Sequence, residues 1–165
     1  MSPAAICVID DDALMRASIG SLLRSIGLDV TTFGSPDEFL STSRDHDPQC
    51  LVLDVRMPGM SGLDLQRRLR ESGDNVPVVF LSAHADVTVA VTAMKAGAVE
   101  FLTKPFREQD LLDAIALALD ADRLRRAEDD RLTALRAAYA RLTTRECEVM
   151  EMVVAGKMNK QIAAA

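Results

Sequence analysis

Two hydrophobic periodicities alternate along the first two thirds of the chain. Short apolar runs, typical of β-strands, alternate with stretches in which apolar residues recur every three to four positions, as in amphipathic helices. Three of the runs are almost unbroken, as in parallel strands covered on both faces. The predicted strands are residues 4–9, 29–33, 50–53, 77–82 and 99–102. Because right-handed connections return each strand beside its start, the pattern predicts an α/β fold, a doubly wound five-stranded parallel sheet with helices on both faces.

The helices between these strands carry start and stop signals. Ser35 and Ser61 are each followed three residues later by an acidic residue, which predicts two capping boxes. The predicted N-caps are Asp12, Ser35, Ser61 and Asp86, and the predicted helix stops are Gly27, Gly73 and Gly97.

The pattern changes after residue 107, where no further strand is predicted. The periodicity predicts one helix over residues 108–140, with a length of about 50 Å. The charged stretch 128–131 interrupts its apolar face, so we expect a solvated joint between two apolar halves. A coiled-coil dimer remains an alternative, although the apolar spacing is regular over only about one heptad. We therefore predict a domain at 1–120, a long linker helix at 108–141 that continues its last helix, and a partial all-α region at 142–165.

Composition limits the class of protein. Of 165 residues, 48% are hydrophobic and 27% charged, which suits a globular core and excludes a disordered chain. The net charge of −6 argues against holding nucleic acid through overall charge. The acidity is concentrated in residues 1–106, which contain 14 acidic and 9 basic side chains. Any binding to DNA must therefore come from a local patch.

The cysteines and the N-terminal sequence indicate a soluble, cytoplasmic protein. Cys7, Cys50 and Cys147 lack metal-ligand spacing and are odd in number, so neither a zinc site nor a disulfide framework is predicted. Cys7 and Cys50 lie in apolar runs, where buried free thiols fit a reducing compartment. No secretion signal is recognisable, and no stretch has the ~18 apolar residues of a membrane helix. We therefore expect no membrane partner.

Carboxylates directly follow two of the predicted strands. Asp10 and Asp11 come after residues 4–9, and Asp54 comes after residues 50–53. Ligands bind at the carboxyl ends of the strands in a doubly wound sheet, so neighbouring strands would bring these side chains together. Crowded carboxylates repel one another unless a cation neutralises them, and carboxylate oxygens are ligands that Mg²⁺ prefers. The sequence therefore predicts a site for Mg²⁺ or another divalent cation.

Two more polar groups fall at the ends of other strands. Ser82 ends the fourth predicted strand, and Lys104 follows the fifth. An Asp nucleophile, a divalent cation, a hydroxyl and an ammonium group form a consistent set for making and holding an aspartyl phosphate. A single Asp after a strand is more often a turn or capping residue, a role that we assign to Asp12. The prediction rests on the combination of groups.

Residues 4 to about 120 resemble the receiver domain of two-component response regulators. The motifs that carry the resemblance are Val8-Ile9-Asp10-Asp11-Asp12, the loop from Asp54 to Gly62, Leu81-Ser82-Ala83, and Phe101-Leu102-Thr103-Lys104-Pro105. The resemblance implies a flavodoxin-like sheet of order 2-1-3-4-5. It also implies that a sensor histidine kinase transfers a phosphoryl group to Asp54, so that the protein is a phosphoacceptor and not an enzyme.

The same resemblance implies a role for each polar residue of the predicted site. Ser82 and Lys104 would contact the phosphoryl oxygens, while Ser82 and Phe101 would form the switch that reports phosphorylation. The surface around Val91, Lys95 and residues 99–101 would mediate a phosphorylation-linked homodimer. Magnesium would be held by Asp11, Asp54 and the backbone carbonyl of Arg56, with Asp10 assisting through water.

Residues 142–163 carry a second resemblance, to the start of a LuxR/FixJ-type helix-turn-helix. Thr143 and Glu146 have capping-box spacing, Gly156 stops that helix, and Asn159 is a candidate cap for the next. The sequence stops at Ala165, before any recognition helix that would enter the major groove, and whether this is a fragment or a natural end stays open. We therefore expect no specific DNA binding by residues 1–165, because the complete C-terminal domain would supply it.

These observations favour a phosphorylation-controlled transcriptional regulator. One alternative is a receiver that acts only through protein contacts, with a helical tail. Another is a phosphatase of the haloacid-dehalogenase type, which also uses Asp and Mg²⁺. Such enzymes have a second acid two residues after the nucleophile, whereas Val55 and Arg56 follow Asp54. This feature argues against the enzyme.

Overall fold

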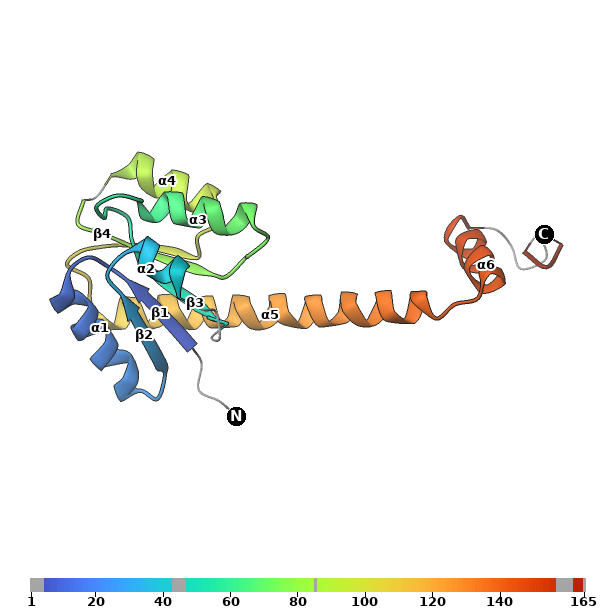
Figure 1. Ribbon diagram of the computed structural model, residues 1–165, viewed down its shortest axis with the longest axis horizontal. Coiled ribbons are helices and arrows are strands. Elements are labelled where there is room, and N and C mark those ends of the chain that lie inside the picture. Colours follow the sequence, from blue (N-terminus) through green and yellow to red (C-terminus); the bar gives the residue numbers. More distant parts are fainter. Residues whose placement is uncertain (1–4, 43–46, 85, 157–161, 165) are drawn as a thin grey trace. The chain divides into compact units, whose positions relative to one another are not determined.

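The computed structural model describes residues 5–42, 47–84, 86–156 and 162–164, and contains a parallel sheet with helices around it (Figure 1). The strands are β1 (Ala5–Ile9), β2 (Asp29–Phe33), β3 (Cys50–Asp54), β4 (Val78–Ser82) and β5 (Glu100–Thr103). The helices are α1 (Ala13–Ser25), α2 (Pro36–Ser41), α3 (Gly62–Glu71), α4 (Val87–Lys95), α5 (Glu108–Ala140) and α6 (Thr144–Val154).

The strand order is β2-β1-β3-β4-β5 and every pairing is parallel, which confirms the predicted fold class. Each predicted strand is present, with ends that differ by about one residue. β3 extends to Asp54, β4 begins one residue after Pro77, and β5 is displaced by one residue. Ala4, the predicted start of the first strand, lies outside the described residues. Such shifts do not change the edge at which the strands end.

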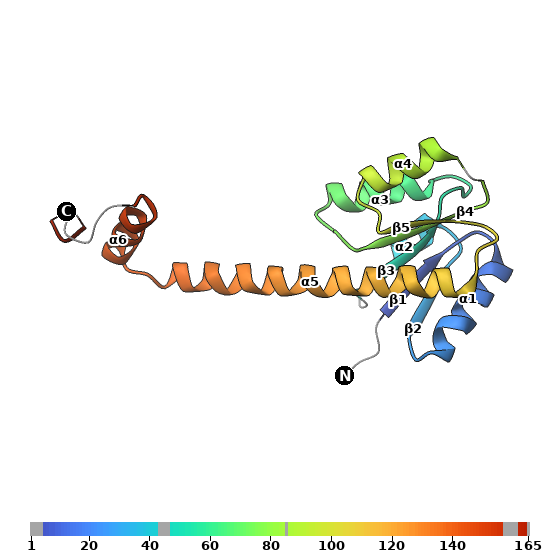
Figure 2. The same ribbon diagram turned by 180° about the vertical axis from the view of Figure 1, so that it is seen from behind.

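Helices cover both faces of the sheet, and Figures 1 and 2 show α1 and the first turns of α5 on the side opposite α2, α3 and α4. On the first face, Leu23 of α1 and Leu111 of α5 are fully buried with Val8 and Val52 of the sheet. The second face buries residues of α2, α3 and α4, among them Leu65, against the strands. β3 and β4 are buried along their whole length, which explains their unbroken apolar sequence.

Side-chain caps start the helices largely as predicted. Asp12 accepts hydrogen bonds from the first turn of α1, and Ser61 and Asp64 form a complete capping box on α3. The predicted box at Ser35 is only half formed. Ser35 accepts from the Glu38 N–H, but the Glu38 carboxylate accepts from the Gly34 N–H at 2.7 Å. The prediction of a reciprocal box was therefore wrong, because the neighbouring amide satisfies the carboxylate instead.

The chain divides into two compact units, residues 1–123 and 124–165, and α5 contributes to both. The single helix predicted for residues 108–140 is confirmed. In the second unit, Thr143 and Glu146 form the predicted capping box of α6, whose Met150, Val153 and Val154 are exposed. The predicted cap at Asn159 falls on residues 157–161, outside the described ones.

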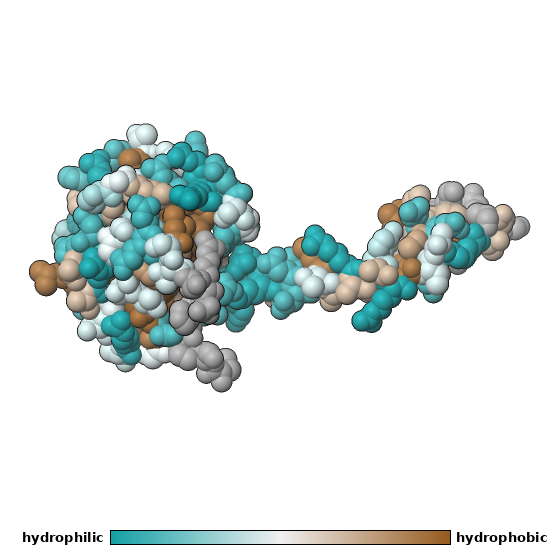
Figure 3. Space-filling model, in the orientation of Figure 1, coloured by the Kyte–Doolittle hydropathy of each residue, from teal (hydrophilic) through white to brown (hydrophobic). Residues whose placement is uncertain are grey.

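The exposed surface in Figure 3 is largely hydrophilic, and two of the three cysteines are buried. Figure 3 shows hydrophobic side chains on this face of the first unit only in small groups among hydrophilic ones. Cys7 and Cys50 are buried free thiols, as predicted, and Cys147 is half-buried. Within the described ranges, none of the helices combines the length and apolar character needed to span a membrane.

Candidate functional site

The predicted polar residues lie at one edge of the sheet because the strands that carry them end in register. Asp54 is the last residue of β3 and pairs with Leu81, which directly precedes Ser82 at the end of β4. Asp10 follows β1, and Lys104 follows β5. Four strands therefore deliver side chains to the carboxyl edge, where ligands bind in this class of sheet.

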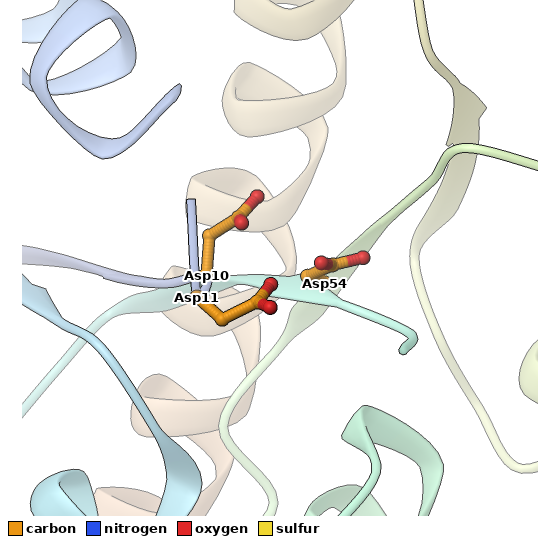
Figure 4. Close-up of side chains that lie close together, drawn as sticks. All are labelled: Asp10, Asp11 and Asp54. Atoms are coloured by element: carbon orange, nitrogen blue, oxygen red, sulfur yellow. The ribbon is translucent and has the colours of Figure 1, made fainter. Parts of the chain in front are cut away.

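Three carboxylates converge at this edge (Figure 4). One oxygen each from Asp10, Asp11 and Asp54 lies within 4.8 Å of the others. Asp10 is only 1% exposed and Asp54 only 7%, whereas Asp11 is exposed. The cluster therefore opens to solvent at Asp11, with its other two members in the interior.

Lys104 supplies a positive charge to this acidic edge. Its Nζ donates to Asp10 Oδ2 at 2.8 Å and lies 3.7 Å from Asp54 Oδ2. Burial lowers the pKa of Lys104, but the hydrogen bond and the charge of Asp10 outweigh burial, so the pKa is raised overall. The ammonium group therefore stays protonated and partly offsets the three carboxylates.

The remaining negative charge of the cluster affects the pKa of Asp54. Burial, and then the Asp10 carboxylate, raise its pKa to about 6, although Lys104 and the Arg56 N–H oppose this. That N–H donates to Asp54 Oδ1 at 3.4 Å, while the Arg56 side chain is exposed. Ionised Asp54 is thus held at an electrostatic cost that an additional cation would remove.

Gly62 fixes the backbone beneath Asp54, a role that its place in the sequence motif does not reveal. Its N–H donates to the Val55 carbonyl at 2.9 Å. A Cβ at position 62 would collide with the Asp54 carbonyl oxygen. Only glycine allows the start of α3 to pass this close to the phosphoacceptor candidate.

Among the described residues, the hydrogen bonds of the Ser82 hydroxyl are to His84 and not to the acidic side chains. Ser82 Oγ donates to the His84 carbonyl at 3.0 Å and accepts from the His84 N–H at 3.2 Å, which closes a local turn. Its backbone carbonyl accepts from the Lys104 N–H at 2.7 Å and ties β4 to the lysine. Ser82 therefore lies at the site's edge with its hydroxyl engaged elsewhere.

Phe101 lies on β5 beside α4 and away from the carboxylates. Its half-buried ring is 6.4 Å from that of Phe80, between centroids. It also lines a cavity of about 370 Å³ with Val87 and Met94 of α4. In the β4–β5 ladder Phe101 pairs with Phe80, whereas Ser82 pairs with Thr103, two residues further along.

One contact at the site was not predicted from the sequence. Arg16 of α1 donates through Nη1 to the Asp10 carbonyl at 2.6 Å. The sequence does show a basic residue one turn into the helix that follows the acidic loop. The direction of its side chain, however, depends on the fold.

The fold and this acidic edge define the class of receiver domains, and comparison with known proteins confirms it. Residues 6–116 match the model of the response regulator receiver domain. Residues 140–165 match the model of the LuxR family of bacterial regulatory proteins. The chain belongs to the response regulators of two-component systems, and it is a transcriptional regulator of the LuxR/FixJ type.

Individual relatives agree with this assignment. Nodulation protein W of Bradyrhizobium diazoefficiens is 46% identical over 98% of this chain and 71% of its own length. The transcriptional regulatory protein FixJ of Azorhizobium caulinodans is 40% identical over 94% and 74%. The solved structure of the response regulator StyR superposes with a TM-score of 0.85, at 45% identity, over 98% of this chain and 82% of that one. As a member of this family, the chain is a signalling regulator and not a classical enzyme.

Proposed function

We propose that Asp54 accepts a phosphoryl group from the phosphohistidine of a sensor histidine kinase. A carboxylate oxygen of Asp54 attacks phosphorus, the phosphorus–nitrogen bond breaks, and the leaving imidazole nitrogen takes up a proton. The observation that carries this proposal is the placement of Asp54 at the end of β3, 3.7 Å from Lys104 and beside two further carboxylates. A buried nucleophile with a cation alongside suits phosphoryl transfer, which depends mainly on positioning and electrostatic stabilisation.

The pocket fits a divalent cation, which we take to be Mg²⁺. The three carboxylates and one ammonium group leave an excess of negative charge, and the donors are all hard oxygen atoms. We assign the binding to Asp10, Asp11, Asp54 and the backbone carbonyl of Arg56. When bound, Mg²⁺ neutralises charge on the phosphoryl oxygens.

Lys104 and Ser82 would hold the phosphoryl group once it is attached. Lys104 already lies within reach of Asp54, whereas the Ser82 hydroxyl must first leave its bond to the His84 carbonyl. Phosphorylation adds about −1.5 to −2 charge and strong acceptors, which favour such a rearrangement. We infer that the change at Ser82 passes to Phe101 and thus to the surface of α4 and β5.

Magnesium should stabilise the protein, and Asp11→Asn should remove most of this effect. At about 100 times the Kd, binding contributes about 2.7 kcal/mol. That corresponds to an increase in Tm of roughly 5 to 10 °C for a chain of this size. Thermal unfolding with and without Mg²⁺ measures the shift. Asp12→Asn is the matched control, because Asp12 caps α1 outside the three-carboxylate cluster. An equal shift in wild type and Asp11→Asn would contradict the assignment.

We further propose that phosphorylation produces a homodimer through α4 and β5. The first unit exposes Val87, Val91 and Met94 along α4, beside the cavity that Phe101 lines. An apolar surface of this kind, next to the proposed switch residue, suits association with a second copy of the chain.

The dimer predicts a change of mass in solution. Phosphorylated wild type should sediment as a dimer, whereas phosphorylated Val91→Asp should stay monomeric because a charge would be buried. Ile26→Asp, at another exposed aliphatic residue, just after α1, is the control and should still dimerise. Monomeric sedimentation of fully phosphorylated wild type would overturn the proposal.

Binding of DNA is the output that we propose for the whole regulator. The LuxR-type match at residues 140–165 and the capped helix α6 support it over a receiver that acts only through protein contacts. In this account α5 links the receiver, near residues 1–120, to the DNA-binding region that begins at about residue 142.

A further inference from the structure

Arg16 contacts the backbone of the acidic loop rather than any of its carboxylates. Its Nη1 donates to the carbonyl oxygen of Asp10 at 2.6 Å. The same nitrogen lies 3.5 Å from the position that a Cβ would take at Gly34, just after β2. The half-buried guanidinium group therefore lies where the ends of β1 and β2 meet.

This contact completes the hydrogen bonding of Asp10. Its N–H donates to the Phe33 carbonyl at 3.2 Å. One carboxylate oxygen accepts from the Asp12 N–H at 2.9 Å, and the other accepts from Lys104 at 2.8 Å. The Asp10 carbonyl is the remaining polar group, and Arg16 binds it. Asp10 is thus fixed by four separate bonds.

Asp11 is held very differently. Its side chain is exposed, and within the described part of the chain no hydrogen bond orients its carboxylate. The Asp10 carbonyl and the Asp11 N–H belong to one planar peptide unit. A group that holds this carbonyl therefore also fixes the position of the Asp11 Cα, from which the side chain leaves the backbone.

We propose that Arg16 is a positioning residue for the cation site: by holding the Asp10 carbonyl, it keeps the Asp11 carboxylate directed toward Asp10 and Asp54. This inference rests on the proposed function, in which these carboxylates bind Mg²⁺. Residues that orient metal ligands without touching the metal typically contribute about 10- to 100-fold to metal affinity. Arg16 would orient Asp11 in this way, through the peptide unit that joins Asp10 to Asp11.

Arg24, on the same helix, offers a matched control. Its Nη2 donates to the Val30 carbonyl at 3.0 Å, and donor and acceptor are again six residues apart. The acceptor lies near the start of β2, while Asp10 follows the end of β1. Arg24→Gln therefore removes the same type of bond at a place remote from the acidic edge.

The test is calorimetric titration of the full chain with Mg²⁺ alone, beside thermal unfolding of the metal-free protein. We expect Arg16→Gln to raise the Kd for Mg²⁺ by about 10-fold or more, and Arg24→Gln to leave it unchanged. Both variants should lower Tm to a similar extent, since each loses one bond to a backbone carbonyl. Arg16→Lys should recover part of the affinity, because an ammonium group can donate to the same carbonyl.

Two results would overturn the role of Arg16. One is a wild-type Kd in Arg16→Gln, and the other is an equal loss of affinity in Arg24→Gln, which would indicate general destabilisation. If Arg16→Gln does not fold, Arg16→Met decides, because it keeps the aliphatic stem and cannot donate: a Kd above the wild-type value supports the role, and a wild-type Kd overturns it. Failure of wild type itself to bind Mg²⁺ would instead contradict the proposed cation site, and the role of Arg16 with it.

Discussion

Asp54→Asn should abolish phosphorylation by a small phosphodonor in the presence of Mg²⁺. An amide oxygen is a far weaker nucleophile than a carboxylate, and among the described residues Asp54 is the carboxylate that both ends β3 and lies beside Lys104. The variant should still fold. Asparagine keeps the shape of the side chain. It removes the carboxylate charge of Asp54, a group whose pKa burial and the Asp10 carboxylate raise to about 6.

Phosphate-affinity electrophoresis measures this effect, with circular dichroism to verify folding. Asp64→Asn is a suitable control, because Asp64 lies in the capping box of α3 and not in the cluster. The control should be phosphorylated at the wild-type rate. Phosphorylation of Asp54→Asn at a comparable rate would show that another residue is the acceptor.

Lys104→Ala should have the second largest effect, on both phosphorylation and stability. Removing one charged group that stabilises a developing negative charge typically slows a reaction by about 10²- to 10³-fold. The substitution also leaves Asp10, which is 1% exposed, without its cation. Removing one partner of a buried ion pair destabilises a protein by about 3 to 5 kcal/mol. We expect the loss of stability to be at the lower end of this range, since the Lys104 side chain is 15% exposed.

Rates of phosphorylation and denaturant unfolding of the metal-free protein measure the two effects. Mg²⁺ should restore part of the stability of Lys104→Ala but not its rate of phosphorylation, because the cation neutralises the carboxylates without replacing the contact to the phosphoryl group. Arg67→Ala, at an exposed basic residue of α3, is the control. A wild-type rate in Lys104→Ala would exclude Lys104 from the phosphoryl site.

Much of the site could be predicted because local sequence marks where each strand ends and which polar residue follows it. The apolar run before Asp54 marks a strand buried on both faces, and the end of such a strand faces the ligand edge of a parallel sheet. The same reasoning applied to Asp10 and Lys104. The structure places Lys104 Nζ 2.8 Å from Asp10 Oδ2 and 3.7 Å from Asp54 Oδ2, as the alternation of strands and helices indicated.

Other features depend on contacts that sequence patterns do not determine. The Ser82 hydroxyl can form hydrogen bonds either within its own turn or at the acidic edge. In the structure it forms them within the turn. The requirement for glycine at position 62 arises from the close approach of α3 to the Asp54 carbonyl. Likewise, Arg16 reaches the Asp10 carbonyl only because α1 packs beside the end of β1. The turn at Ser82 is one of two local options for its hydroxyl, whereas the contacts of Gly62 and Arg16 depend on how the helices pack against the strands.

Chemical mapping of the modified residue shows whether Asp54 carries the phosphoryl group. Borohydride reduction of the phosphorylated chain converts an aspartyl phosphate to homoserine, which tandem mass spectrometry of peptides can locate. We expect homoserine at position 54 in wild type and none in Asp54→Asn. Homoserine at position 10 or 11, or a phosphoryl group that resists borohydride, would contradict it.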